Sequence, residues 1–131
     1  MPASVLPFLM FQGDAEAALN LYLSVFPDAK VLDTTRYKEG EEGTAGALKL
    51  ATFLVAGQSV RCFDSPVNHA FTFTPSFSFF VDCESEEELR RLAAGLGEGG
   101  GVMMAPDNYG FSRLFTWISD RFGVSWQLNL P

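Results

Sequence analysis

Two short apolar runs, 5–11 and 77–81, are each followed by a segment with helical periodicity, and this repetition constrains the fold more than any other feature. The first helical segment spans 14–26, with Asp14 as its expected N-cap, and the second starts after Ser85. Apolar residues recur at i, i+3, i+4 and i+7 in both segments, the pattern of a helix with one buried face. The two halves of the sequence therefore begin alike.

Three strands are predicted after each helical segment. The first half gives 30–36, 47–55 and 59–64, and the second half gives 102–105, 111–118 and 124–130. A glycine-containing turn joins the last two strands of each half. The sequence therefore predicts an α+β fold, with one domain over 1–131 built from two βαβββ units. Unit one is expected at 1–66, a linker bracketed by prolines at 67–75, and unit two at 76–131.

The balance of charge excludes two classes of partner. The chain carries a net charge of −7 and no Lys/Arg cluster, so we expect neither nucleic acid nor an anionic membrane surface to bind it. The acidic stretch 39–46 is expected to be a solvated loop. Cys62 and Cys83 stand apart without metal-ligand spacing, which favours reduced, buried thiols. With no basic N-terminal segment and no long apolar run, a cytoplasmic location is expected.

Two long motifs resemble one branch of a known superfamily. They are FDSPVNHAFTFTPSFSFFVDC at 63–83 and GFSRLFTWISDRFGVSWQLNL at 110–130. Together with the doubled βαβββ order, they resemble the vicinal oxygen chelate superfamily of glyoxalases, bleomycin resistance proteins and extradiol dioxygenases. The resemblance is closest to the PhnB-like branch, whose members often carry a demethylubiquinone methyltransferase label. It implies a half-open barrel-like sheet with helices outside, a ligand cleft on the concave side, and a homodimer.

The resemblance also implies which side chains line the cleft. In the superfamily the position of Gln127 points into the cleft, and strand alternation then turns Ser125 and Asn129 the same way. The same count on the other strands gives Pro7, Leu9, Phe11, Ser59, Arg61, Phe63, Ser76, Ser78 and Phe80. A cleft with one apolar and one polar wall suits a small organic ligand.

Six residues of this set are the expected ligand-binding residues. They are Arg61, Gln127, Phe11, Phe63, Ser76 and Ser125. Arg61 and Gln127 are the candidate recognition groups for a carboxylate, phosphonate or carbonyl oxygen. The competing interpretation is that Arg61 lies along the sheet with its charged head in water.

Metal-binding members of the superfamily hold their ion with one inward residue from the first and last strand of each unit. Those positions match Pro7, Arg61, Ser76 and Gln127 here. Pro7 offers no ligand atom, Arg61 is a permanent cation, and Ser76 is a weak neutral ligand. We therefore expect no metal ion at these positions and no other cofactor.

Two residues are candidates for catalysis. His69 is the chain's only histidine, and its unperturbed pKa lies near neutrality, but a linker histidine is usually just solvated. Asp64 could orient His69, or it could cap the linker turn. A displaced metal site formed by Asp64, His69 and Gln127 is an alternative to the absent one. Tyr109 and Phe111 could close the mouth of the cleft or simply pack.

Three functions remain open, and the sequence does not decide whether the protein is an enzyme. The first is binding of a small, anionic organic ligand without a metal ion, which the loss of metal ligands at the four superfamily positions favours. The second is a lyase or isomerase that uses the displaced metal site. The third is methyl transfer, as the family label suggests. The glycine run at 96–101 follows a helix and precedes a strand, which is the wrong order for an adenosylmethionine cradle.

Overall fold

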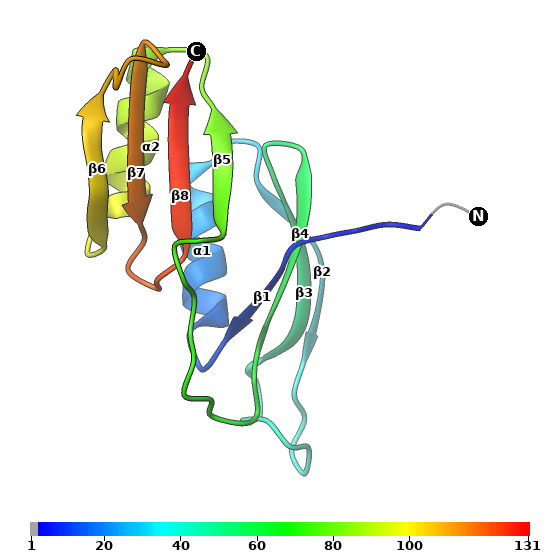
Figure 1. Cartoon of the computed structure of the whole chain (residues 1–131). Coiled ribbons are helices and arrows are strands. Elements are labelled where there is room, and N and C mark those ends of the chain that lie inside the picture. The colour runs from blue at the N-terminus through cyan, green and yellow to red at the C-terminus, as the bar shows by residue number, and fades with distance from the viewer. Residues whose placement is uncertain (1–2) are drawn as a thin grey trace. The chain divides into compact units, whose positions relative to one another are not determined.

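The computed structural model describes residues 3–131, which divide into two compact units, one ending at Ala70 and the other starting at Phe71. The first unit contains β1 (Phe8–Phe11), α1 (Ala15–Val25), β2 (Lys30–Arg36), β3 (Leu48–Val55) and β4 (Gln58–Asp64) (Figure 1). Its sheet has the order β1-β4-β3-β2, in which β1 runs parallel to β4 and the other neighbours are antiparallel. This unit is called unit 1 below.

The second unit repeats this order of elements. It contains β5 (Ser78–Asp82), α2 (Glu86–Gly97), β6 (Gly101–Asp107), β7 (Leu114–Ser119) and β8 (Ser125–Leu130). Its sheet has the order β5-β8-β7-β6, again with one parallel pair, β5 and β8. This unit is called unit 2. The predicted α+β fold of two βαβββ units is therefore confirmed.

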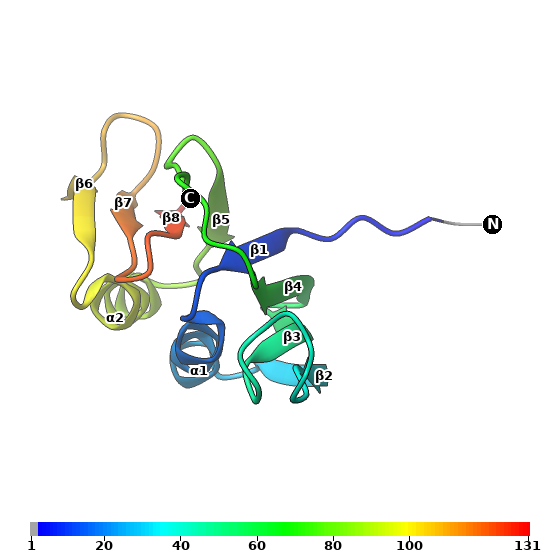
Figure 2. The ribbon, with the colours of Figure 1, turned by 90° about the horizontal axis from the view of Figure 1, so that it is seen from below.

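The core of unit 1 lies between α1 and one face of its sheet (Figure 2). Val60, Cys62 and Phe53 are almost fully buried on that face, and the Phe53 ring lies 6.1 Å from the ring of Tyr22 on the helix. Burial of these side chains supplies the main stabilisation of the unit, since each large apolar side chain contributes roughly 1.5–3 kcal/mol. The opposite face of this sheet is not covered by α1, and we call it the open face of unit 1.

Unit 2 is built in the same way against α2. Trp126 and Leu128 on β8 are buried on the helix side, and the Trp126 ring lies 4.8 Å from Phe79 on β5. Asp120 organises the turn before β8, because its carboxylate accepts backbone N–H groups from Phe122 and Val124 and the indole N–H of Trp126. The opposite face of the sheet is the open face of unit 2.

The two helices start in different ways. Ser85 caps α2, as predicted, because its hydroxyl accepts the backbone N–H of Glu88 at 3.1 Å. Asp14 occupies the N-cap position of α1 but makes no side-chain capping bond there. The start of α1 is held instead by Asp64, a residue distant in sequence. Within residues 3–131, neither helix is long and apolar enough to cross a membrane.

Candidate functional site

The register of β1 differs from the expected one. Phe8 lies opposite Arg61 on β4 and its ring stacks on Phe63 at 4.9 Å, so Phe8 belongs to the open face of unit 1. Leu9 and Phe11 point the other way and are each only 4% exposed in the core. The expectation that Leu9 and Phe11 line the open face is therefore wrong. Every residue of this strand is apolar, so alternation in the sequence could not decide which set faces the helix.

Arg61 stands on the open face of unit 1, as its strand position predicts. Its Nε donates to the hydroxyl of Thr52 at 3.3 Å, which fixes the direction of the guanidinium group. Phe8 flanks it on β1, and Asp33 lies beyond Thr52 on β2 without forming an ion pair with Arg61. Within residues 3–131, Arg61 has no carboxylate partner. Its two terminal nitrogens are therefore available to an outside acceptor.

A chain of hydrogen bonds crosses the open face of unit 2. The indole N–H of Trp117 donates to the Ser125 hydroxyl at 2.8 Å, and that hydroxyl lies 2.6 Å from the hydroxyl of Ser78. The side-chain amide of Gln127 donates to Ser78 at 3.2 Å. Gln127 and Ser125 thus lie on the same face, away from α2, as the alternation of β8 predicts.

Ser76 does not lie where it was expected. It precedes β5 in a turn, where its hydroxyl bonds to that of Thr74 at 2.8 Å. The residue of β5 opposite Gln127 is Phe80, which is 57% exposed. The expected position of Ser76 on the strand is therefore wrong, because Pro75 and Ser76 form a turn and the strand starts after it.

The metal-ligand positions implied by the resemblance change accordingly. Opposite Arg61 stands Phe8 in place of Pro7, and opposite Gln127 stands Phe80. Phenylalanine has no ligand atom and arginine is a permanent cation, so only the Gln127 amide oxygen could bind a metal ion. These residues do not fit the superfamily's metal ion. Elsewhere in residues 3–131, no three His, Cys, Asp or Glu side chains gather closely enough to hold one.

Asp64 and His69 have separate surroundings. The Asp64 carboxylate is buried on the helix side, where one oxygen accepts the backbone N–H groups of Gly13 and Ala15, both at 2.9 Å. His69 is exposed, with its Nε2 atom 3.3 Å from the hydroxyl of Ser65. Asp64 therefore supports the start of α1 and not the linker turn. A catalytic role for either residue stays a prediction.

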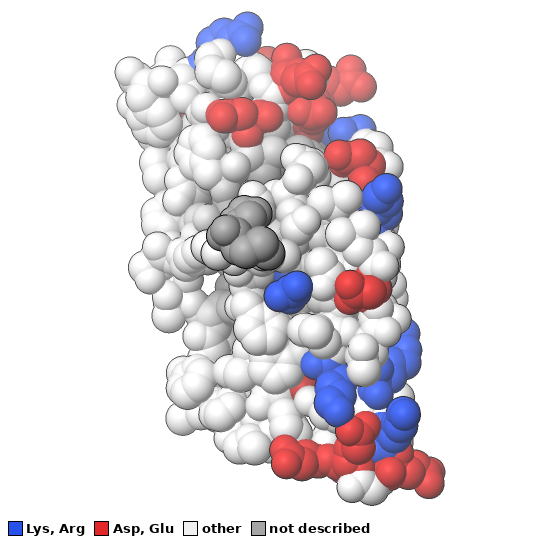
Figure 3. Space-filling model, turned by 90° about the vertical axis from the view of Figure 1, so that its right-hand side faces the viewer, with Lys and Arg blue, Asp and Glu red and all other residues white. Residues whose placement is uncertain are grey.

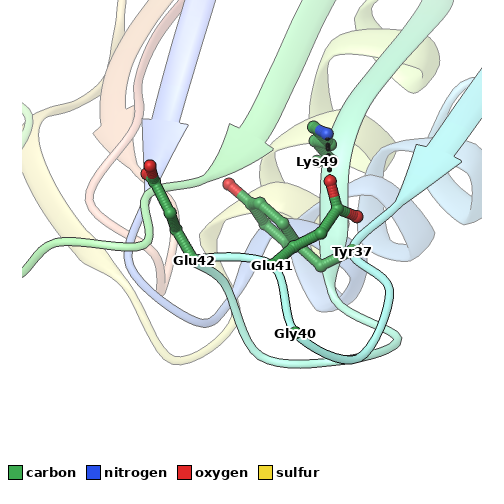
Figure 4. A pocket seen from close by; sticks show the side chains of 5 residues that line it. All are labelled: Tyr37, Gly40, Glu41, Glu42 and Lys49. Carbon is green, nitrogen blue, oxygen red and sulfur yellow. Dashed lines mark hydrogen bonds and ion pairs between the residues drawn. The ribbon is translucent and has the colours of Figure 1, made fainter.

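The acidic stretch after β2 forms a small surface pocket with its own ion pair (Figure 4). The pocket measures about 390 Å³, and Glu41 there bonds to Lys49 at 2.5 Å and accepts the backbone N–H of Lys38. The hydrogen bond from Lys49 lowers the pKa of Glu41. Figure 3 shows acidic and basic side chains mixed at this end of unit 1. Within the acidic stretch, Glu41 is thus neutralised by a lysine of the same unit.

Tyr109 and Phe111 pack with Phe115 at the turn between β6 and β7. The Phe111 and Phe115 rings lie 5.1 Å apart in an edge-to-face arrangement, and the rings of Tyr109 and Phe111 are stacked at 6.2 Å. Phe111 nevertheless remains 61% exposed. Packing explains how these rings are held, and it leaves an aromatic surface beside the open face of unit 2.

Each unit consists of a strand, a helix and three strands, and its first strand pairs in parallel with its last strand. This arrangement, repeated twice, defines a protein of the vicinal oxygen chelate superfamily. The chain belongs to the family described as 3-demethylubiquinone-9 3-methyltransferase, whose model matches residues 3–129. A search of curated proteins found no match.

Solved structures agree with this assignment. A PhnB protein from Bacillus cereus, whose description carries the same methyltransferase label, is 43% identical; the match covers 98% of this chain and 100% of that one, with a TM-score of 0.94. A glyoxylase/bleomycin resistance protein/dioxygenase domain from Frankia shares the fold at 17% identity, 99% and 98% coverage, and a TM-score of 0.66. The fosfomycin resistance protein FosX from Mesorhizobium loti does so at 14% identity, 100% and 93% coverage, and a TM-score of 0.65.

Proposed function

We propose that the chain binds a small organic anion on the open face of unit 1, with Arg61 as its charged contact and without a metal ion. The observation that carries this proposal is the state of Arg61. Arg36, Lys49 and Arg90 each pair with a glutamate, whereas Arg61 has no carboxylate partner within residues 3–131, a state that it shares with Lys30 and Arg91. What favours Arg61 as the contact for an anion is its place on the open face of unit 1, beside the stacked rings of Phe8 and Phe63.

The surroundings of Arg61 favour an organic anion over a small inorganic one. The stacked rings of Phe8 and Phe63 provide an apolar surface on the same face, and Phe8 is more than half exposed. A guanidinium fork recognises a carboxylate or phosphonate through two parallel hydrogen bonds. The rings beside it would take up the hydrocarbon part of the ligand.

A thermal-shift screen of small carboxylates and phosphonates tests the proposal. Compounds that bind should raise the melting temperature of the parent protein by mass action. Replacing Arg61 by Met should weaken their binding by about 1.5–3 kcal/mol, because a charge-assisted pair is lost, while stability hardly changes. Arg90→Met is the matched control: it removes the same charge from an exposed helix pair and should leave binding unchanged. Equal shifts in all three proteins would refute the assignment.

The methyltransferase description belongs to the family and to the Bacillus cereus relative, and it suggests an alternative function. In this chain the glycine run lies between α2 and β6, so it does not lead from a strand into a helix. That order offers no helix N-terminus to an adenosylmethionine carboxylate or ribose. Adenosylmethionine therefore belongs in the same screen, and its binding would favour the alternative.

We also propose that the protein acts in the cytoplasm as a homodimer. The two buried, free thiols suit a reducing compartment. The outermost strand β2 is exposed along its whole length and β6 at every residue except Met104, and their exposed residues include Leu32, Val102 and Met103. Such apolar residues on sheet edges are typical of surfaces that pair with another chain.

A further inference from the structure

The side-chain amide of Gln127 is hydrogen-bonded through its nitrogen, and its oxygen has no donor among residues 3–131. Its Nε2 donates to the hydroxyl of Ser78 at 3.2 Å, so its Oε1 atom is directed away from Ser78. No residue from 3 to 131 donates a hydrogen bond to this oxygen. Gln127 is half-buried as a residue, and its amide oxygen, with two lone pairs, is thus left without a donor on the open face of unit 2.

Counting protons along the network explains this orientation. The indole of Trp117 can only donate, so the Ser125 hydroxyl accepts from it and donates its own O–H to the hydroxyl of Ser78. The hydroxyl of Ser78 in turn points to the backbone carbonyl of Pro75, at 3.5 Å. Ser78 therefore accepts both from Ser125 and from the Gln127 amide. Within residues 3–131, the Gln127 oxygen therefore receives no hydrogen bond from this network, and one of the two N–H groups of the same amide has no acceptor there.

Aromatic side chains flank Gln127 on both neighbouring strands. Phe80 on β5 and Trp117 on β7 are its direct partners in the sheet register, so all three lie in one row on the open face. Directly paired residues have Cβ atoms about 4.5–5.5 Å apart. Phe115, which is buried, supports this row from the side, with its ring 6.3 Å from that of Phe80. A ligand group that reaches the Gln127 oxygen would therefore contact aromatic rings on either side.

We propose that the open face of unit 2 binds a neutral hydroxyaryl group, whose O–H donates to Oε1 of Gln127 while its ring packs on Phe80 and Trp117. The inference goes beyond the proposed function, because it assigns a separate ligand group to the open face of unit 2. A ligand group that has only acceptor atoms would leave Oε1 without a donor. A purely apolar group would leave the amide oxygen desolvated without a partner.

Three simple probes separate the two parts of this group. Phenol has a ring and a donor, anisole has a ring without a donor, and cyclohexanol has a donor without an aromatic ring. Each is titrated into ¹⁵N-labelled protein, and the indole signal of Trp117 and the side-chain amide signal of Gln127 are followed. Phenol is expected to bind roughly fivefold more tightly than anisole, the effect of one hydrogen bond, and more tightly than cyclohexanol.

Two variants and a control assign the effect to the oxygen. Gln127→Leu should abolish the preference for phenol over anisole, because the acceptor is gone. Gln127→Glu should retain it, because a carboxylate oxygen also accepts the phenol proton. Gln58→Leu makes the same change at an exposed glutamine of unit 1 and should leave the preference intact.

The outcomes distinguish this inference from the proposed function. Equal binding of phenol and anisole to the parent, no binding of either, or a preference that survives Gln127→Leu would each overturn the hydroxyaryl site. Any of these results leaves the Arg61 proposal standing if acids still lose affinity in Arg61→Met. Conversely, a phenol preference that depends on Gln127 upholds the site even if Arg61→Met has no effect on anions.

Discussion

Burial in the interior of each unit changes the pKa of a cysteine thiol, Cys62 in unit 1 and Cys83 in unit 2. Burial raises the pKa of the Cys62 thiol to about 12 and that of Cys83 to about 11, from an ordinary value of 9.0. We predict that both thiols of the native protein react slowly with a disulfide reagent at pH 8, and rapidly once denaturant unfolds the chain. Complete modification of native protein as fast as that of unfolded protein would contradict the burial.

The same thiols make stability depend on alkaline pH. Unfolded thiols ionise near pH 9, whereas the folded ones keep their protons up to about 12 and 11. Folded protein therefore binds more protons above pH 9, and the stability that this protonation contributes is lost as the pH rises further. Denaturation midpoints of parent and Cys62→Ala, compared between pH 8 and pH 10.5, should converge as the pH rises.

Residue positions were predictable from the sequence where polar and apolar residues alternate. The strand carrying Gln127 shows such alternation, so its two faces were assigned correctly. The strand carrying Phe8 and Phe11 is apolar at every position, and only pairing with β4 reveals that Phe8 lies beside Arg61. Thr52 and Trp117 were missed, although their places in alternating strands could have indicated which face they occupy.

At the scale of elements, the start of α1 depends on a strand distant in the sequence. Asp64 at the end of β4 accepts two backbone N–H groups there, and Ala15 is fully buried. We predict that Asp64→Ala lowers the free energy of unfolding by about 1.5–3 kcal/mol, because buried donors lose a charged acceptor. Asp64→Asn, which keeps an acceptor oxygen, should cost less.

Asp14→Ala provides the control for this prediction. Asp14 holds the N-cap position but makes no side-chain capping bond, so its removal should change stability by no more than about 0.5 kcal/mol. Urea denaturation of the three variants measures the differences. A larger loss for Asp14→Ala than for Asp64→Ala would contradict the assignment of the cap.

The order of elements was predictable because helical and strand periodicities differ clearly. Ser85 and Glu88 marked the start of α2 correctly, since both partners of the cap lie within one turn. The cap of α1 could not be predicted in this way. Its acceptor, Asp64, lies at the end of β4, far along the chain from the start of α1. Local sequence spacing carries no information about such a contact.

At the scale of the whole molecule, the two units have the same order of elements, but their open faces carry different polar side chains. The open face of unit 1 presents an arginine without a carboxylate partner, and that of unit 2 presents an uncharged network around Gln127. The repeat was predictable as a pattern of elements, because core positions recur in both halves. The difference between the open faces depends on individual polar residues, which the repeat does not constrain.

The proposed dimer is also a property at this scale. Light scattering at micromolar concentration should report twice the chain mass of 14.4 kDa. Replacing Val102 by Asp on the exposed strand β6 should shift the population toward monomer, because a charge would be placed in an apolar contact. A monomer mass for the parent at every concentration would rule the dimer out.

The central claim is that Arg61 recognises the charge of an organic anion, and a binding cycle tests it most directly. Calorimetry gives the affinity of one stabilising carboxylic acid and of its uncharged primary amide, for the parent and for Arg61→Met. The coupling between ligand charge and Arg61 is predicted to be about 1.5–3 kcal/mol, the value of a charge-assisted hydrogen-bonded pair. A coupling near zero, with acid and amide losing affinity equally, would contradict the account.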